Sequence, residues 1–440
     1  MTITTDLSST LMLADGSKII LSDDQQQARC DVLTALIDNG QPEAVLSGPA
    51  GSGKTTLMRA LIQDLRDAGR LVKLLAPTGK AARRLHEVTG EATSTIHRPL
   101  YESVSSKLKA TKKERAAYKL LAETKPDTLP SFEDWLRALR AETNKAVEED
   151  LLFSDPRQVG DAGTVLVVDE SSMVGLRLAS DLRSQLSGAQ VLWVGDREQL
   201  PPVNDRWGCE WGNPTALLTQ IHRQAADSPI IGLATAIRSG QDWHRINPEP
   251  PVYRDACSPQ RVAEWLAQQH SKNADAVCLT FTNAKRHKIN ALTRAVLGVS
   301  GEVLTVGERV LVTTNNYHVG LFNGEVVRVV GIRERESVYG HAVHELQVEG
   351  VNTLGGQPLW IGYDPEALAA GQRPKGRGLL SIDYGYCLSI HKSQGSQWHT
   401  VGLIHDGACW GLANRNADDY RRLIYTAVTR AAERLLVFNQ

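Results

Sequence analysis

The sequence predicts an α/β protein in which two domains each contain a parallel β-sheet covered by helices. Short, continuously apolar runs are typical of strands that are buried on both faces of such a sheet. These runs lie at 44–46, 71–75, 164–168 and 190–194, and then in a second group at 276–280, 401–404 and 434–438. A helical pattern with Leu57, Leu61 and Leu65 at four-residue spacing follows the first run. Four prolines within 247–259 mark the expected link between the two domains.

Two segments interrupt the predicted sheets. Residues 101–159 are rich in Lys, Glu and Ala, which predicts a mainly helical subdomain inserted into the first domain. The basic part of this insert, 107–119, is either a strand-binding surface or only a solvated helix face. Residues 323–380 are rich in Gly and in β-forming residues, which predicts a small β-barrel inserted into the second domain. The first domain is therefore expected at 1–100 and 160–246, and the second at 260–322 and 381–440.

Composition and charge exclude several classes of protein. The 440 residues are 42% hydrophobic and 22% charged, which is ordinary for a soluble chain of roughly two to four domains. The net charge of −1 speaks against a protein that coats nucleic acid with a broad basic surface, but it allows a motor with a narrow basic channel. The six scattered cysteines predict neither a zinc site nor a disulfide framework. We see no signal peptide and no apolar run of membrane-spanning length, so we expect a cytoplasmic protein with no membrane partner.

One segment has the pattern of a phosphate-binding loop. Gly48-Pro-Ala-Gly-Ser-Gly-Lys54-Thr55 fits G-x-x-x-x-G-K-[ST], with a predicted strand before it and an amphipathic helix after it. Backbone N–H groups would then face phosphates at a helix N-terminus, where the helix dipole favours anions. We expect Lys54 to reach the β- and γ-phosphates of ATP and Thr55 to bind Mg²⁺. The nucleotide-binding residues expected here are Gly48, Gly51, Ser52, Gly53, Lys54, Thr55 and Thr56.

Two further strands lead into polar residues. The run 164–168 is followed by Asp169 and Glu170, of which one carboxylate can hold Mg²⁺ while the other polarises the attacking water. A solvated strand end is the alternative, but the phosphate-binding loop earlier in the chain favours the catalytic interpretation. The run 190–194 leads into a loop that contains Gln199, which is placed to sense the γ-phosphate.

Taken in order, these and other segments resemble the motifs of superfamily 1 helicases, in particular the RecD-like and Dda-type group (superfamily 1B). The resemblance covers most of the chain. The matching segments are Leu21-Ser-Asp-Asp-Gln25 (Q-motif), Leu75-Ala-Pro-Thr78-Gly-Lys80-Ala-Ala (motif Ia), Thr95-Ile-His97, Asp169-Glu170 (motif II), Gly195-Asp-Arg-Glu-Gln199-Leu-Pro-Pro (motif III), Leu218-Thr-Gln-Ile-His222-Arg223-Gln, Thr280-Phe-Thr282-Asn283, Asn323-Gly324, Tyr386-Cys-Leu-Ser389-Ile-His391-Lys392-Ser-Gln394-Gly395 (motif V) and Tyr425-Thr-Ala-Val-Thr429-Arg430-Ala (motif VI).

The resemblance implies two RecA-like P-loop domains, a mainly helical insert in the first and a small β-barrel of the SH3-like kind in the second. It implies that Arg223 approaches the γ-phosphate and that Arg430 is an arginine finger, so that the catalytic set becomes Lys54, Glu170, Gln199, Arg223 and Arg430. Further nucleotide contacts are implied for Gln25 and His222 at the adenine and for Gln394 and Gly395, and Asp169 joins Thr55 at the metal. The residues implied to contact the DNA strand are Thr78, His97, Thr282, Asn283 and His391.

The implied activity is ATP-dependent movement along single-stranded DNA and unwinding of duplex DNA, in the 5′-to-3′ direction, in replication, repair or recombination. ATP and Mg²⁺ are the implied cofactors. Single-stranded DNA and duplex junctions are the implied partners, with replication or single-strand-binding proteins as further candidates. The protein is expected to act as a monomer.

Two other functions fit part of the pattern. An RNA helicase or nucleoprotein-remodelling translocase of the same superfamily would share the motor motifs, but nothing here resembles the zinc-rich N-terminal module of the best-known RNA members. A P-loop kinase or a nucleotide-gated binding switch needs only one core domain, so motifs V and VI speak against it. Structural roles also compete for His97 and His391, which core packing would explain, and core packing is the stronger interpretation of Trp207 and Trp211.

Overall fold

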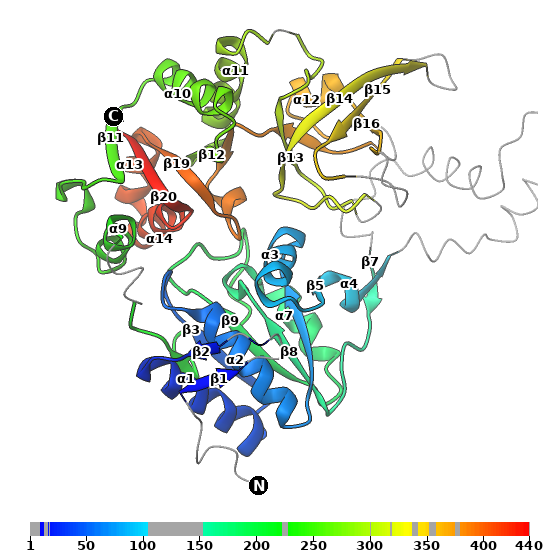
Figure 1. The fold of residues 1–440 in the computed structure, drawn as a ribbon, viewed down its shortest axis with the longest axis vertical. Coiled ribbons are helices and arrows are strands. Elements are labelled where there is room, and N and C mark those ends of the chain that lie inside the picture. Colours follow the sequence, from blue (N-terminus) through cyan, green and yellow to red (C-terminus); the bar gives the residue numbers. More distant parts are fainter. Residues whose placement is uncertain are drawn as a thin grey trace, which may run out of the picture.

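Three larger β-sheets organise the chain, one in the lower part of Figure 1 and two in the upper part. The computed structural model describes residues 9–12, 16, 18–103, 153–221, 228–299, 301–316, 319–336, 342–351, 358–374 and 379–439. Two of the sheets are parallel and carry helices, which confirms the predicted α/β class. Within these ranges, no helix has the length and apolar character that crossing a bilayer needs.

The first parallel sheet has the strand order β10-β3-β9-β8-β4-β5 and, with its helices, forms what we call the first core unit. Neighbouring residues of β8 pack on opposite faces: Val165 and Val167 lie in a core with α1 and α2, whereas Leu166 and Val168 lie in a core with α7. Apolar side chains on both faces explain why this strand reads as a continuous apolar run. The strands are β3 Glu43–Ser47, β4 Leu71–Ala76, β5 Thr93–Thr95, β8 Thr164–Val168, β9 Gln190–Gly195 and β10 Ala216–Leu217, and the helices are α1 Asp23–Leu33 (continued by a π-helical turn, Thr34–Asp38), α2 Lys54–Asp67, α3 Gly79–Thr89, α4 His97–Leu100 and α7 Leu176–Ser184.

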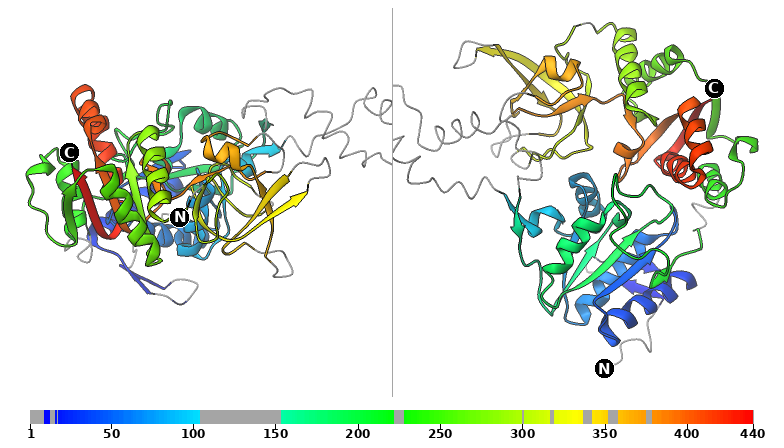
Figure 2. Two further views of the ribbon diagram at one scale, coloured as in Figure 1. Left: turned by 90° about the horizontal axis from the view of Figure 1, so that it is seen from above. Right: turned by 180° about the vertical axis from the view of Figure 1, so that it is seen from behind.

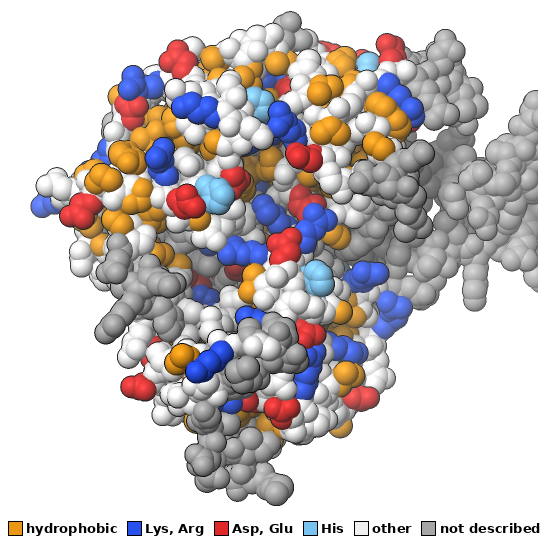
Figure 3. Space-filling view, viewed as in Figure 1, with side chains coloured by type: hydrophobic (Ala, Val, Ile, Leu, Met, Phe, Trp, Pro, Cys, Tyr) orange, Lys and Arg blue, Asp and Glu red, His pale blue; other side chains and the backbone are white. Residues whose placement is uncertain are grey.

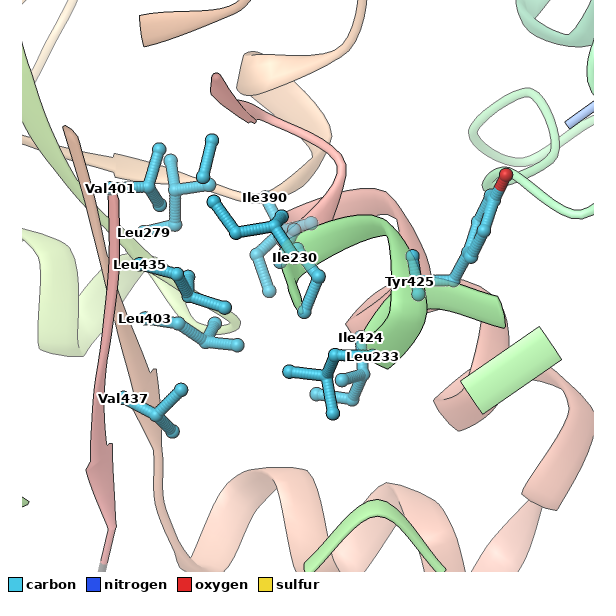
Figure 4. Packing of buried hydrophobic residues seen from close by; sticks show 14 of the residues in the cluster. Ile230, Leu233, Leu279, Ile390, Val401, Leu403, Ile424, Tyr425, Leu435 and Val437 are labelled. Atoms are coloured by element: carbon cyan, nitrogen blue, oxygen red, sulfur yellow. The ribbon is translucent and has the colours of Figure 1, made fainter. Parts of the chain in front are cut away.

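The second parallel sheet has the order β11-β20-β19-β12-β18 and, with its helices, forms the second core unit. Figure 4 shows one face of this sheet, where side chains of β19 and β20 pack toward α9 and α14. The ring of Tyr425 closes one end of this core, and its hydroxyl points away from it. The elements are β11 Val252–Ala256, β12 Ala276–Thr280, β18 Cys387–Ser389, β19 Trp398–His405, β20 Ala431–Asn439, α9 Pro229–Arg238, α10 Pro259–Ser271, α11 Asn283–Val296, α13 Gly407–Arg415 and α14 Ala417–Val428.

The border between the two core units differs from the prediction. Helix α9, which falls inside the predicted first domain (160–246), packs its apolar residues Ile230 and Leu233 into the core of the second unit. The proline-containing segment 247–259 is not a link, because it contains β11, a strand of the second sheet paired with β20. By packing and pairing, α9 and β11 therefore go with the second core unit.

The third sheet is antiparallel, with the order β16-β15-β14-β13-β17, and lies beside the second parallel sheet in Figure 2. It extends past both ends of the predicted insert 323–380, because β13 pairs with β14 on one side and with β17 on the other. Its end strands approach each other at one backbone bond, from the N–H of Leu380 to the oxygen of Gly362 (2.8 Å). Closure into an SH3-like barrel stays a prediction. The elements are β13 Arg309–Val312, β14 Val326–Glu336, β15 Ala342–Val348, β16 Ile361–Tyr363, α12 Pro365–Ala369 and β17 Ile382–Tyr384.

Two short antiparallel ribbons complete the described structure. Strand β6 (Tyr101–Ser103) pairs with β7 (Phe153–Pro156) at the two ends of the predicted insert 101–159. Residues 104–152 of that insert, including its basic part, lie outside the described residues, so its helical character stays a prediction. The second ribbon, β1 (Thr10–Met12) with β2 (Lys18–Ile20), precedes α1.

A candidate nucleotide site and a neighbouring cationic cavity

The predicted phosphate-binding loop connects β3 to α2. Gly51 (φ 80°) and Gly53 (φ 75°) adopt the left-handed conformation, which costs little only for glycine. Helix α2 then begins at Lys54, so the unpaired N–H groups of its first turn lie beside the loop. The predicted combination of a glycine-rich turn and a helix N-terminus is therefore formed, and it suits an anionic ligand.

A cavity of about 330 Å³, which we call the nucleotide cavity, lies against this loop. Both core units contribute to its walls. The predicted site residues that line it are Gly51, Gly53, Lys54, Thr55, Asp169, Glu170 and Gln199 from the first unit and Gly395 and Arg430 from the second. Side chains up to several hundred residues apart in the chain thus meet at one site.

Lys54 and Gln25 both bind backbone oxygens of the loop. The ammonium of Lys54 donates to the carbonyl oxygens of Gly48 (2.6 Å) and Pro49 (2.9 Å). The amide Nε2 of Gln25 donates to the oxygen of Gly53 (3.2 Å), and its Oε1 accepts from the N–H of Ser22 in the capping box of α1. Gln25 therefore ties α1 to the loop, and the implied contact with adenine stays a prediction.

The two carboxylates differ in backbone and environment. Burial, and then the charge of neighbouring Glu170, raise the pKa of Asp169 to about 6. Glu170 has φ 50°, a left-handed conformation that costs roughly 1–3 kcal/mol for a residue with a side chain. Thr55 and Asp169 both line the cavity and offer oxygen atoms, the ligand type that Mg²⁺ prefers. This donor set fits the predicted metal.

Gln199 lines the same cavity from the loop after β9. The side chain is 5% exposed, and its Oε1 has no hydrogen-bond partner among the described residues. Buried amide oxygens are normally paired, so this atom indicates a partner such as a water or a ligand in the cavity. The location agrees with the predicted role as a sensor of the γ-phosphate.

Arg430 reaches the cavity from the second unit, just after α14. The residue is 4% exposed, and its guanidinium donates to the oxygens of Thr426 (3.1 Å) and Ser396 (3.1 Å) and to the hydroxyl of Thr429 (3.2 Å). These bonds to neutral oxygens hold a cation at the cavity that Lys54 also lines. The role of arginine finger stays a prediction.

Three predicted nucleotide contacts lie beside the cavity rather than in its wall. Ser52 uses its hydroxyl to bond Pro49 (2.8 Å), and the N–H of Gly48 donates to the oxygen of Gly195 (3.1 Å). Thr56 is exposed on α2. The bonds of Ser52 and Gly48 therefore shape the loop.

The remaining predicted site residues are Gln394, His222 and Arg223. Gln394 donates to the oxygen of Leu200 (3.0 Å) and lines a second cavity, not the nucleotide cavity, although its neighbour Gly395 does line the nucleotide cavity. His222 and Arg223 lie outside the described residues, so their roles stay predictions.

The second cavity, of about 510 Å³, lies where the two core units and the antiparallel sheet meet. We call it the cationic cavity, because its wall contains four basic side chains: Lys80, Arg286, Arg373 and Lys392. Figure 3 shows Lys and Arg side chains gathered along the hollow between the upper and lower parts of the molecule. Cations and short polar groups in one hollow suit the phosphates of a nucleic-acid strand.

Of the residues predicted to contact DNA, only two line this cavity. Thr78 and His391 do, and Thr78 also caps α3 by accepting from the N–H of Ala81. Thr282 caps α11, which begins at Asn283, and neither residue is in the cavity wall. His97 begins α4, away from the cavity, with its ring centroid 5.7 Å from that of Tyr101.

The basic residues of the cationic cavity are the ones that the predicted set of contacts missed. Lys80 and Lys392 stand inside motifs Ia and V, so the signal was present, and Arg286 lies three residues after Asn283 on α11. Burial lowers the pKa of Lys392, and it lowers the pKa of Lys80 to about 8. Arg286 forms an ion pair with Asp383. Arg373 follows no recognisable motif.

The tryptophans after motif III belong to the core, as predicted. Trp211 is 3% exposed and packs with Trp193 of β9. Trp207 is partly buried against the same cluster, with the guanidinium of Arg422 4.9 Å from its ring centroid.

Two family models match the chain. The AAA domain matches residues 20–247, just over half of the chain and the part that contains the phosphate-binding loop. The UvrD-like helicase C-terminal domain matches residues 384–438, which contain motifs V and VI.

Curated relatives match along most of the chain. The "ATP-dependent RecD2 DNA helicase" of Deinococcus radiodurans is 29% identical over 412 residues, which cover 90% of this chain and 46% of the relative. The "ATP-dependent DNA helicase dda" of Enterobacteria phage T4 is 24% identical over 301 residues, which cover 64% of this chain and 59% of the relative. The chain thus spans about half the length of these relatives.

The fold is also that of a solved helicase structure. The crystal structure of the Pif1 helicase from Candida albicans aligns with a TM-score of 0.50 at 19% identity, over 96% of this chain and 95% of that one. The ordered motifs, the two core units and these matches agree. The chain belongs to the superfamily 1B helicases, in the RecD-like and Dda-type group.

Proposed function

We propose that the chain hydrolyses ATP to move along single-stranded DNA and to unwind duplex DNA. One observation carries the proposal: the nucleotide cavity is completed by Lys54 and Glu170 from one core unit and by Arg430 from the other. Hydrolysis then depends on how the two units sit against each other. A motor needs this dependence, whereas a single-domain kinase or binding switch does not.

The residues of the nucleotide cavity divide the chemistry. Lys54 leaves its carbonyl partners to bind the β- and γ-phosphates. Thr55 and Asp169 would hold Mg²⁺, which would neutralise phosphate charge. Glu170 orients the attacking water and accepts its proton. Arg430 stabilises the charge that builds on the transferred phosphoryl oxygens.

Short segments that line both cavities support coupling between ATP and the strand. Motif V lines the cationic cavity with His391 and Lys392 and the nucleotide cavity with Gly395. Helix α3 starts at the cationic cavity with Lys80, while Arg84, one turn further on, lines the nucleotide cavity. A shift of either segment on nucleotide binding therefore moves groups at the strand.

The cationic cavity favours a phosphate backbone over specific bases. Its lysines and arginines neutralise phosphates, so binding should weaken with salt and show little sequence preference. DNA as the polymer and 5′-to-3′ movement rest on the family, whose Deinococcus member is named an ATP-dependent DNA helicase. The protein is proposed to act as a monomer, with duplex junctions and single-strand-binding or replication proteins as partners.

Unwinding of tailed duplexes tests this function. We expect Mg²⁺- and ATP-dependent strand separation of a DNA duplex that carries a 5′ single-stranded tail, and none of a blunt duplex. Unwinding of only the 3′-tailed duplex would refute the direction and keep the motor. Unwinding of RNA duplexes alone would identify the protein as an RNA helicase of the same superfamily. The absence of unwinding and translocation on every substrate would refute the proposal.

A further inference from the structure

A single hydroxyl group connects three motifs at the junction of the two core units. The hydroxyl of Tyr425, in motif VI on α14, accepts from the N–H of Ala50 in the phosphate-binding loop (2.9 Å). It also donates to Oδ2 of Asp196 in motif III (2.6 Å). The ring stays anchored in the core of the second unit, with the hydroxyl directed out of it (Figure 4).

The direction of both hydrogen bonds is fixed by chemistry. A backbone N–H only donates, so the Tyr425 oxygen must accept from Ala50, and the single phenolic proton is left for the Asp196 carboxylate. Burial raises the pKa of Tyr425 well above its ordinary value, so this proton is present at neutral pH. The bond to Oδ2 of Asp196, at 2.6 Å, lies within the range of O–H···O hydrogen bonds, and burial raises the pKa of Asp196.

The Ala50 contact involves a residue of the loop that lines the nucleotide cavity. Ala50 lines the nucleotide cavity, as do Gly51 and Lys54. In this conformation the N–H of Ala50 is bound to Tyr425, and the ammonium of Lys54 is bound to carbonyls of the same loop. A phosphate that enters must therefore compete with groups of the protein for these donors.

We propose, on the basis of the ATP-driven function above, that Tyr425 is a nucleotide-dependent latch between motif VI and the phosphate-binding loop. In the free protein its hydroxyl holds both Ala50 and Asp196. When a nucleotide phosphate takes the N–H of Ala50, Tyr425 releases the loop and keeps Asp196. The remaining bond to Asp196 keeps motif VI connected to motif III. This connection holds Arg430, which lies five residues after Tyr425, at the cavity.

The two bonds have separate thermodynamic consequences. The bond to Ala50 exists only in the free protein, so it opposes nucleotide binding. The bond to Asp196 exists in both states, so it cancels in the affinity but positions Arg430 during turnover. Tyr425→Phe removes both bonds and keeps the ring. It should tighten nucleotide binding about fivefold, the value of one exchanged neutral hydrogen bond. It should also lower kcat about tenfold, because Arg430 loses its support.

Titration calorimetry with Mg²⁺ and a non-hydrolysable ATP analogue measures the first effect without any turnover. Tyr420→Phe is the matched control: Tyr420 lies on the same helix, but its hydroxyl is bonded to Trp243, His244 and His405, away from the nucleotide cavity. We expect the dissociation constant to fall in Tyr425→Phe and to stay unchanged in Tyr420→Phe, with both variants unfolding cooperatively.

Steady-state kinetics provides the second readout. A lower KM together with a lower kcat in Tyr425→Phe supports the latch, because general damage to the site would raise KM. An unchanged or larger dissociation constant for the analogue in Tyr425→Phe overturns the proposal. If the wild-type protein binds the analogue but hydrolyses no ATP, the proposed motor function fails, while the affinity comparison still decides on the latch.

Discussion

The two cavities at the junction of the core units are adjacent but differ in charge. The nucleotide cavity combines two carboxylates, Asp169 and Glu170, with three cations, Lys54, Arg84 and Arg430. The cationic cavity contains four basic side chains and a single carboxylate, Asp383, which is paired with one of them. The first cavity therefore suits a metal–phosphate complex, which carries both signs of charge, and the second suits a bare phosphate backbone.

The difference predicts two kinds of response to substitution. In the nucleotide cavity each charged group faces one reacting phosphate, so the loss of one group should nearly abolish turnover. In the cationic cavity several cations share a delocalised polyanion, so each loss should weaken strand binding in a graded, salt-dependent way. The following predictions test whether the two cavities separate in this manner.

The largest effect is expected at Arg430. Arg430→Ala should lower kcat for ATP hydrolysis about 10³–10⁵-fold, because the charge on the transferred phosphoryl group loses its stabilising cation. Steady-state ATPase assays at saturating single-stranded DNA measure this loss. Arg430→Lys keeps the charge without the planar donors and should recover only part of the rate. A decrease in kcat of less than tenfold in Arg430→Ala would show that Arg430 is not the arginine finger.

A slightly smaller effect is expected at Glu170. Glu170→Gln keeps the shape of the side chain but cannot accept a proton, so kcat should fall about 10²–10⁴-fold while ATP still binds. Single-turnover hydrolysis with separate measurement of ATP affinity distinguishes the two steps. Glu302→Gln, an exposed position, is the control. Near-normal turnover in Glu170→Gln would assign the base to another residue.

The cationic cavity should respond more mildly. Lys392→Ala removes one cation from the wall, so the slope of log affinity for single-stranded DNA against log salt should decrease by about 0.7. Fluorescence anisotropy titrations at several salt concentrations measure this slope. Lys288→Ala, an exposed lysine on α11, should leave it unchanged. Equal slopes in Lys392→Ala and the wild type would place the strand elsewhere.

The smallest effect is a pH dependence from Lys80. Because burial lowers its pKa from 10.5 to about 8, Lys80 loses its charge between pH 7 and 9, and strand affinity should fall over this range. Lys80→Met should flatten the profile. The folded pKa lies below the unfolded one, so the charged lysine opposes folding below pH 8. This opposition is relieved between about pH 8 and 10.5, and the strand-free protein should gain stability as affinity declines. A wild-type profile identical to that of Lys80→Met would contradict the assignment.

The two cavities also differed in how far the sequence could predict them. The phosphate-binding loop is local: the conformations of Gly51 and Gly53 and the start of α2 at Lys54 follow from eight consecutive residues. The cationic cavity is assembled from α3, α11, motif V and the antiparallel sheet, and no local pattern places Arg286 or Arg373 beside Lys392. The motifs instead predicted strand contacts at short polar residues such as Thr282, which caps α11 in the structure.

The fold shows the same division between local and tertiary information. Both parallel sheets were predictable, because strands buried on two faces read as apolar runs. The border between the units was not, because the prolines of 247–259 resemble a linker and only packing shows that α9 belongs to the second core. Likewise, β13 joins the antiparallel sheet through pairing with β17, which lies about 70 residues further along the chain.

The dependence of ATP hydrolysis on a strand tests the coupling of the two cavities most directly. The measurement is the steady-state ATPase rate of the wild-type protein with no polymer, with single-stranded DNA and with RNA of equal length. We predict strong stimulation by single-stranded DNA, because segments that line the cationic cavity, the proposed strand site, also line the nucleotide cavity. A rate that is the same with and without polymer would contradict the coupling, even if ATP is hydrolysed.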